Sequence, residues 1–201
     1  MLHIINYMVT LCDDEMTRLH AALALTPLPA ANACFFLDVD GTLLDFAATP
    51  DGVHVDDELI ELLAAAARSV QGALALVSGR SLESLDRVLA PLQLPAAGVH
   101  GFERRDARGI VHRQTLEENR LESARAVLEQ FVARHPGLLL EDKRAALALH
   151  FRQVPNLEEL VQVELARTLP GLRPDFELLE GEAVLEIKPA GLSKATAVEA
   201  F

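Results

Sequence analysis

Residues 34–42 of this chain read CFFLDVDGT, and the expected fold depends on this stretch. An apolar run too short for a helix leads directly into two carboxylates and a glycine, which predicts a buried strand ending in a turn. Residues two apart in a strand point to the same face, so Asp38 and Asp40 are expected to project together from its carboxyl end. Open α/β sheets bind their ligands at that end.

Two acids in this position suit a reaction in which one carboxylate attacks and the other handles the proton. A divalent cation is then needed, because an anionic nucleophile must approach an anionic phosphoryl group. Two other interpretations compete. Asp-Gly between apolar runs is also typical of a plain hairpin turn. An EF-hand loop also begins Asp-x-Asp, but its glycine is sixth whereas Gly41 is fourth, so this alternative fails. The hairpin remains open from this stretch alone.

Composition limits the class of protein. A chain of 201 residues, half of them hydrophobic, is long enough for one large domain or for a core with a smaller insert. The formal charge of −12 argues against nucleic acid and anionic membranes as main partners, so any phosphate site must be made basic locally. Cys12 and Cys34 do not resemble a disulfide or metal motif, and Cys34 is expected to be a small buried residue.

The N-terminal segment is not expected to be a secretory signal or a membrane span. Residues 2–11 are apolar but much shorter than a membrane span, and neither Lys nor Arg precedes them. We therefore interpret residues 1–33 as a weakly structured or helical lead-in. A cytoplasmic location follows by default.

The first half of the chain alternates strands and helices. Asp56 is expected to cap a helix through residue 69, and a strand follows at 73–77. Ser81 would cap a second helix through residue 89, before a third strand at 97–100. This β-α-β-α-β order predicts a Rossmann-like parallel sheet with right-handed crossovers.

The second half follows another pattern, in which a helix is twice followed by a hairpin. After a short strand at 109–113, a capping box at 115–118 is expected to open a helix, and Asn156 to open another. The helices precede hairpins at 138–152 and 176–187, and Ser193 then caps a last helix. This order predicts a separate α/β sandwich inserted at about 107–182 into a core formed by residues 34–106 and 183–201.

Further polar groups follow these strands. Ser78, Gly79 and Arg80 stand between a strand end and a helix start, which favours a phosphate cradle, although Ser-Gly is also typical of a plain turn. Lys194 falls in the first turn of the last helix, where a cation opposes the helix dipole. A bound phosphate would explain a cation at this position, whereas a lysine exposed to solvent is the common alternative.

The first hairpin of the insert carries Glu141, Lys143, His150 and Arg152. Strand parity places His150 and Arg152 on one face. This face could hold sugar hydroxyls or be merely the wet side of an antiparallel sheet. His100, at the end of a core strand, is equally ambiguous.

Taken in order, these pieces resemble the haloacid dehalogenase-like phosphatases and, within them, the trehalose-6-phosphate phosphatases of bacteria. The resemblance runs from about residue 35 to 201. It rests on four stretches, namely FLDVDGTL at 36–43, GALALVSGRS at 72–81, AGVHG at 97–101 and LEIKP at 185–189.

The resemblance implies roles for individual residues. Asp38 would be the nucleophile that forms an aspartyl-phosphate, and Asp40 the general acid and base. Mg²⁺ would be held by the Asp38 carboxylate and the Asp40 backbone carbonyl. The phosphate would be anchored by Ser78, with Gly79 and Arg80, and by Lys194. The implied sugar-binding residues are Glu141, Lys143, Arg152 and Glu186.

The sequence departs from the family pattern in three places. Ala195 replaces a glycine, and Glu182 stands where a lysine often follows the hairpin glycine. The Gly-Asp-Asp-type segment that would supply a further Mg²⁺ carboxylate is absent from residues 1–201. We therefore expect a C-terminally truncated phosphatase that is a poor catalyst and only marginally stable.

The expected function is hydrolysis of trehalose 6-phosphate to trehalose and phosphate, with Mg²⁺ as cofactor. The alternatives are a related sugar phosphatase, or a truncated fragment that binds a sugar phosphate without turnover. The expected partner is a small sugar phosphate, with neither nucleic acid nor membrane, and the chain is expected to be a monomer.

Overall fold

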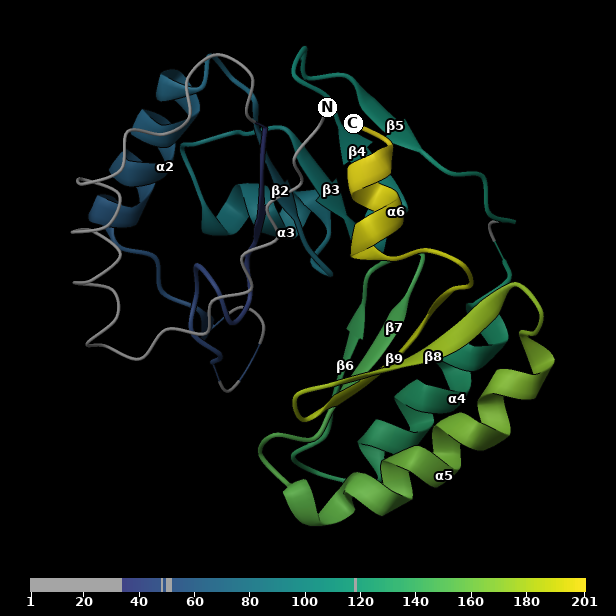
Figure 1. The fold of residues 1–201 in the computed structure, drawn as a ribbon. Coiled ribbons are helices and arrows are strands. Elements are labelled where there is room, and N and C mark those ends of the chain that lie inside the picture. Colours follow the sequence, from purple (N-terminus) through teal and green to yellow (C-terminus); the bar gives the residue numbers. More distant parts are fainter. Residues whose placement is uncertain (1–33, 48, 50–51, 118) are drawn as a thin grey trace.

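The computed structural model describes residues 34–47, 49, 52–117 and 119–201, which form two units, each built on its own sheet (Figure 1). The first unit contains a five-stranded sheet in the order β1-β2-β3-β4-β5, and the second a four-stranded sheet in the order β6-β7-β9-β8. The expected lead-in at residues 1–33 lies outside the described residues. In the part of the chain that is described, no helix is long and apolar enough to cross a membrane.

The first sheet is parallel where the sequence predicts it. Strand β1 (Phe35–Asp38) pairs in parallel with β2 (Leu74–Val77), and β2 pairs in parallel with β3 (Ala96–Gly98). Asp38 is in register with Val77, so both strands end at the same edge of the sheet. Strands β4 (Glu103–Arg105) and β5 (Val111–Arg113) then continue the sheet in antiparallel fashion.

Helices cover both faces of this sheet. Alternate residues Leu74 and Leu76 pack into one apolar cluster with residues of α2 (Asp57–Ser69) and α3 (Leu82–Val88). Val77, one position on, belongs to a second cluster with α6 (Lys194–Glu199). The period of two along a strand therefore divides the apolar side chains between the two faces, which confirms the predicted α/β class.

The predicted helix caps of the first unit are confirmed. The Asp56 side chain accepts a hydrogen bond from the backbone N–H of Leu59 at 2.8 Å. Ser81 accepts one from the N–H of Ser84 at 3.1 Å. Ser193 caps α6 in a capping box, which fixes the start of this helix and with it the position of Lys194.

The second unit consists of two helix-and-hairpin repeats, as expected. The hairpins are β6 (Leu139–Asp142) with β7 (Leu147–His150), and β8 (Phe176–Gly181) with β9 (Val184–Pro189). The helices α4 (Glu122–Ala133) and α5 (Glu158–Thr168) cover the sheet face that points away from the first unit (Figure 1). Short 3₁₀ turns in the described part of the chain include η2 (Val99–Gly101), η3 (Pro155–Leu157) and η4 (Leu169–Gly171).

Sheet membership moves the expected boundaries between the units. Strand β5 at 111–113 pairs with β4 and so belongs to the first sheet, not to an insert that begins at 107. Strand β9 pairs with both β7 and β8, so the second sheet extends through Pro189 rather than ending at 182. The sequence predicted the strand at 109–113 but assigned it to the insert, and it missed β4, because ERR carries no apolar residue that would indicate a strand.

Two predicted helix starts are wrong. Helix α4 begins at Glu122 without a side-chain cap, whereas Thr115 remains in the link between the units; Glu118 lies outside the described residues. Helix α5 follows the 3₁₀ turn η3, so Asn156 does not cap it. Pro155 opens that turn earlier, because its fixed φ suits the first position of a helix.

The other corrections concern the ends of strands. Strand β3 ends at Gly98, and His100 follows it in a left-handed conformation with φ of 55° rather than inside a strand. Cys34 is exposed and not buried, because it lies before the first residue of β1.

Candidate active site

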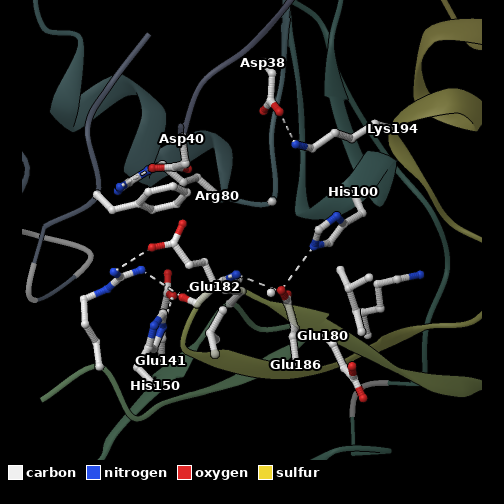
Figure 2. A pocket seen from close by; sticks show the side chains of 18 of the residues that line it. Asp38, Asp40, Arg80, His100, Glu141, His150, Glu180, Glu182, Glu186 and Lys194 are labelled. Atoms are coloured by element: carbon white, nitrogen blue, oxygen red, sulfur yellow. Dashed lines mark hydrogen bonds and ion pairs between the residues drawn. The ribbon is translucent and has the colours of Figure 1, made fainter. Parts of the chain in front are cut away.

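A cavity of about 460 Å³ lies between the carboxyl edge of the first sheet and the open face of the second sheet (Figure 2). Its volume falls in the range of ligand pockets, about 300–1,000 Å³. Both units supply charged groups to it. The sequence-predicted residues that line it are Asp38, Asp40, Gly79, Arg80, Glu141, Lys143, Arg152, Glu186 and Lys194.

Asp38 and Lys194 meet at the edge of the first sheet. Asp38 is the last residue of β1, and Lys194 is the first residue of α6. The Lys194 Nζ donates to Asp38 Oδ2 at 2.5 Å, while the Val39 N–H donates to Asp38 Oδ1 at 2.8 Å. The carboxylate is therefore oriented by two donors, one of which is a cation.

Asp40 also faces the cavity but has a different partner. Its carboxylate accepts from Arg80 Nε at 2.9 Å and from Arg80 Nη2 at 2.7 Å (Figure 2). Arg80 is buried. The two acids therefore lie two residues apart at the carboxyl end of β1, and each has its own cation beside it, Lys194 for Asp38 and Arg80 for Asp40.

The hairpin interpretation of this stretch is wrong. Asp40 makes only an isolated bridge with Leu44, and β1 pairs with β2 rather than with the residues that follow it in the described chain. Gly41 has a φ of +75°, which permits the tight turn after Asp40.

Ser78 lies behind the cavity wall. It is only 1% exposed, and its Oγ accepts from the Arg80 N–H at 3.0 Å, whereas Gly79 and Arg80 themselves line the cavity. The geometry accordingly gives Ser78 a place in the turn that presents Gly79 and Arg80.

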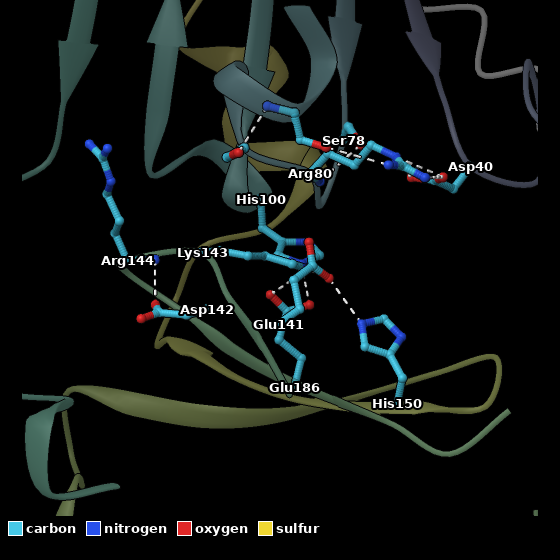
Figure 3. Close-up of polar contacts among 12 residues, drawn as sticks. Asp40, Ser78, Arg80, His100, Glu141, Asp142, Lys143, Arg144, His150 and Glu186 are labelled. Carbon is cyan, nitrogen blue, oxygen red and sulfur yellow. Dashed lines mark hydrogen bonds and ion pairs between the residues drawn. The ribbon is translucent and has the colours of Figure 1, made fainter. Parts of the chain in front are cut away.

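The second unit contributes a row of acids. Glu141 on β6, Ala148 on β7 and Glu186 on β9 are in register across three strands, so all three lie on the same sheet face. His150 Nε2 lies 2.9 Å from Glu141 Oε2 (Figure 3). Lys143 Nζ lies 3.1 Å from Glu186 Oε1 and 3.8 Å from Glu141 Oε2. This face is therefore a connected polar network rather than a wet surface.

Both acids of this row are held in the ionised form. Burial alone would raise the pKa of Glu186, but the hydrogen bond to His100 and the charge of Lys143 outweigh it and lower that pKa. Burial likewise opposes ionisation of Glu141, whose pKa is lowered by the hydrogen bond to His150 and by Lys143. Ionised carboxylates only accept hydrogen bonds, so they suit ligands that carry hydroxyl groups.

Arg152 closes the other side of the cavity. Its Nη1 lies 3.0 Å from Glu182 Oε1, and its Cζ lies 5.1 Å from the centroid of the Phe46 ring. Phe46 belongs to the first unit, so this cation–π contact joins the two units. The sequence interpretation missed Phe46, although an aromatic residue soon after the acidic turn could have indicated it.

The sequence also left His100 and Lys188 without a role. His100 Nε2 lies 3.1 Å from Glu186 Oε2 and lines the cavity. Lys188 is 4% exposed, contacts Glu177 and donates to the Leu192 carbonyl at 2.5 Å. The local signal for both residues is their position near the end of a strand, since His100 lies two residues after β3 and Lys188 is the last residue but one of β9.

The carboxylate oxygens at the edge of the first sheet are ligands of the type that Mg²⁺ prefers. Within the described residues no group of three or more His, Cys, Asp or Glu side chains could hold a metal ion. Mg²⁺, however, is commonly held by one or two carboxylates together with waters and the phosphate of a substrate. The Asp38 carboxylate, with Asp40 two residues on, provides oxygen donors of this type at the sheet edge.

Solved structures share the fold of this protein. A solved phosphatase of the haloalkanoate (HAD) enzyme superfamily from Bacteroides thetaiotaomicron superimposes with a TM-score of 0.50 at 18% identity, over 83% of this chain and 70% of that one. The C-terminal domain of a trehalose-6-phosphate phosphatase from Candida albicans superimposes with a TM-score of 0.72 at 22% identity, over 83% and 60%. The fold is that of the haloacid dehalogenase superfamily.

Sequence comparison identifies the family. The model of the trehalose-phosphatase family matches residues 36–201. A trehalose-6-phosphate phosphatase of Escherichia coli is 41% identical over 179 residues, which are 89% of this chain and 67% of that protein. A probable trehalose-phosphate phosphatase of Sinorhizobium fredii is 43% identical over 174 residues, 85% of this chain and 64% of that protein. The chain belongs to the trehalose-phosphatase family and spans about two thirds of the length of these relatives.

Proposed function

We propose that this chain carries the active site of a phosphatase that hydrolyses trehalose 6-phosphate to trehalose and phosphate. The observation that carries the proposal is the cavity itself. Its first-unit side presents Asp38 beside Lys194, and its second-unit side presents Glu141 and Glu186 beside Lys143. One side thus has the chemistry for a phosphoryl group and the other for sugar hydroxyls. The names of the bacterial relatives support trehalose 6-phosphate as the substrate.

Asp38 serves as the nucleophile in this proposal. One of its carboxylate oxygens attacks phosphorus, the bond from phosphorus to the sugar oxygen breaks, and an aspartyl-phosphate forms. Asp40 gives its proton to the leaving sugar oxygen and later takes one from the water that hydrolyses the aspartyl-phosphate. Lys194, at 2.5 Å from Asp38, is placed to neutralise charge on the phosphoryl oxygens.

Mg²⁺ fits this site through the Asp38 carboxylate and the Asp40 backbone carbonyl, where it would reduce repulsion between the nucleophile and the phosphoryl group. Gly79 and Arg80 line the phosphate side, with Ser78 supporting their turn. On the sugar side, ionised Glu141 and Glu186 accept hydrogen bonds from hydroxyl groups, whereas Lys143 and Arg152 donate them.

We further propose that the second unit acts as a cap over the first. The support is that the cavity is lined by both units, while the chain crosses between them only near residues 114–121 and 190–193 in the described part. Closing the units would exclude water while the aspartyl-phosphate forms.

The test is Mg²⁺-dependent phosphate release from trehalose 6-phosphate, measured beside a panel of other sugar phosphates. Asp38→Asn should abolish release, because an amide cannot form the aspartyl-phosphate. Asp45→Asn is the matched control, since Asp45 lies on the same segment but is exposed and outside the cavity lining. A higher kcat/KM for phosphate release from another sugar phosphate would show that this compound, and not trehalose 6-phosphate, is the preferred substrate. Full activity of the Asp38 variant would refute the assignment of the nucleophile.

A further inference from the structure

His100 connects the two sides of the cavity. It belongs to the turn η2 of the first unit, whereas its partner Glu186 lies on β9 of the second unit. The Nε2 of His100 is 3.1 Å from Glu186 Oε2, and His100 and Glu186 are 8% and 6% exposed (Figures 2 and 3). Since Lys143 occupies the other carboxylate oxygen, both oxygens of Glu186 have fixed partners.

The backbone around His100 is held in an uncommon conformation. Val99 and His100 have φ values of 47° and 55°, a region that non-glycine residues rarely adopt and β-branched residues adopt least. The Val99 N–H donates to the Arg80 carbonyl at 2.9 Å, and the His100 N–H donates to the Ser78 carbonyl at 3.1 Å. The turn is thus joined directly to the segment that lines the phosphate side of the cavity.

Close packing fixes the ring and the turn. A Cβ added at Gly79 would lie 2.9 Å from the His100 ring, so the ring rests on the Gly79 backbone. A Cβ added at Gly101 would lie 2.9 Å from Ala197, which belongs to the helix that carries Lys194. Val99 packs against Ala145 and Ala146 in the turn between β6 and β7. The His100 turn therefore contacts the phosphate segment, the Lys194 helix and the second unit at once.

We infer that His100 is a positioning residue that holds Glu186 at a set distance from the phosphate side and so favours phosphate esters of a sugar over small phosphate esters. This inference rests on the proposed function. His100 acts through Glu186, whose carboxylate accepts hydrogen bonds from the sugar. Without the ring, Glu186 loses its hydrogen bond to the first unit and keeps its link to Lys143 of its own unit.

A purely structural histidine is the competing explanation, and substrate comparison separates the two. The experiment measures kcat and KM for trehalose 6-phosphate and for nitrophenyl phosphate, with melting temperatures, in wild type, His100→Ala and His100→Gln. Glutamine places an amide N–H near the position of Nε2, so it keeps a donor to Glu186. His112→Ala is the matched control, because His112 is an exposed histidine of the same sheet whose contact is with Asp106.

Loss of one hydrogen bond to a buried charge should lower kcat/KM for trehalose 6-phosphate about 10- to 100-fold in His100→Ala, mainly through KM. The loss in kcat/KM for nitrophenyl phosphate should be at least about tenfold smaller. His100→Gln should recover most of the kcat/KM for trehalose 6-phosphate. The His112 variant should match wild type. Equal losses on both substrates, or no recovery with glutamine, would overturn the inference.

Binding distinguishes this inference from the proposed function. If wild type releases no phosphate from trehalose 6-phosphate, the proposed function fails, and calorimetric binding of that compound then tests His100. A dissociation constant at least about tenfold weaker in His100→Ala, recovered in His100→Gln, would support the positioning role. Equal binding by the three proteins, or no binding by wild type, would overturn it.

Discussion

Replacing Lys143 with methionine should both destabilise the protein and disrupt the sugar-binding face. Lys143 Nζ lies 3.1 Å from Glu186 Oε1, and the two side chains are 9% and 7% exposed. Methionine keeps the length of the side chain but removes its charge. Breaking a buried ion pair by removing one partner costs about 3–5 kcal/mol, because the remaining charge is left uncompensated.

The loss of stability expected for Lys143→Met is smaller than about 3–5 kcal/mol. Glu186 keeps its hydrogen bond to His100, and the pair borders a cavity that solvent enters. We therefore expect Lys143→Met to lower the free energy of unfolding by about 2–3 kcal/mol. For a chain of this size, that corresponds to a fall in melting temperature of roughly 4–12 °C.

Urea unfolding of a double-mutant cycle measures this effect. The cycle comprises wild type, Lys143→Met, Glu186→Gln and the double variant, and neighbouring charges of this type should couple by about 1–3 kcal/mol. Arg144→Met is the control, since Arg144 lies on the same turn but pairs with Glu83 at 3.6 Å with side chains 84% and 70% exposed. That control should stay within about 0.5 kcal/mol of wild type. Additive single effects, or a loss in Lys143→Met no larger than in the control, would refute the reasoning.

Three further predictions follow from the same site. The free energy of unfolding should fall as the pH drops below about 4.5, the ordinary pKa of a glutamate. The folded state lowers the pKa values of Glu141 and Glu186, so the unfolded chain takes up protons first as the pH falls. An acid titration followed by circular dichroism should show this loss, and the loss should be smaller in Glu186→Gln. Gly79→Ala should displace the His100 ring, which lies 2.9 Å from the added Cβ, and cost about 1–3 kcal/mol in urea unfolding together with a raised KM for trehalose 6-phosphate. Arg152→Ala should lower kcat/KM for trehalose 6-phosphate about 10- to 100-fold, as expected for loss of a charged hydrogen-bond donor, and should lower that for nitrophenyl phosphate less; equal losses would contradict a sugar-binding role.

The local parts of this protein were predictable from its sequence. The apolar run before Asp38 predicts β1, and the side-chain caps Asp56, Ser81 and Ser193 mark the starts of three helices. These features are local, because a strand period or a capping hydrogen bond involves residues only two to three positions apart. The same period of two predicted that Asp38 and Asp40 would project together from the carboxyl end of their strand, and both line the cavity there.

Local signals failed where long-range pairing decided the outcome. Thr115 has the sequence of a capping box, yet the chain there continues as a link and α4 begins at Glu122. The strand at 109–113 was predicted, but its place in the first sheet depends on β4, a strand without apolar residues that the sequence did not indicate. Strand propensity depends on such neighbours more than on the residues themselves.

Only the tertiary structure decided how the charged residues of the site are paired. Arg80 and Asp40 are 40 positions apart, and His100 and Glu186 are 86 positions apart. The sequence by itself determined which ionisable groups stand at strand ends, because strand periodicity is a local property. Their partners were decided when folding brought distant segments together, within the first unit for Arg80 and Asp40 and between the two units for His100 and Glu186. Tertiary contacts decide this pairing because a charge can remain buried only where packing supplies a partner.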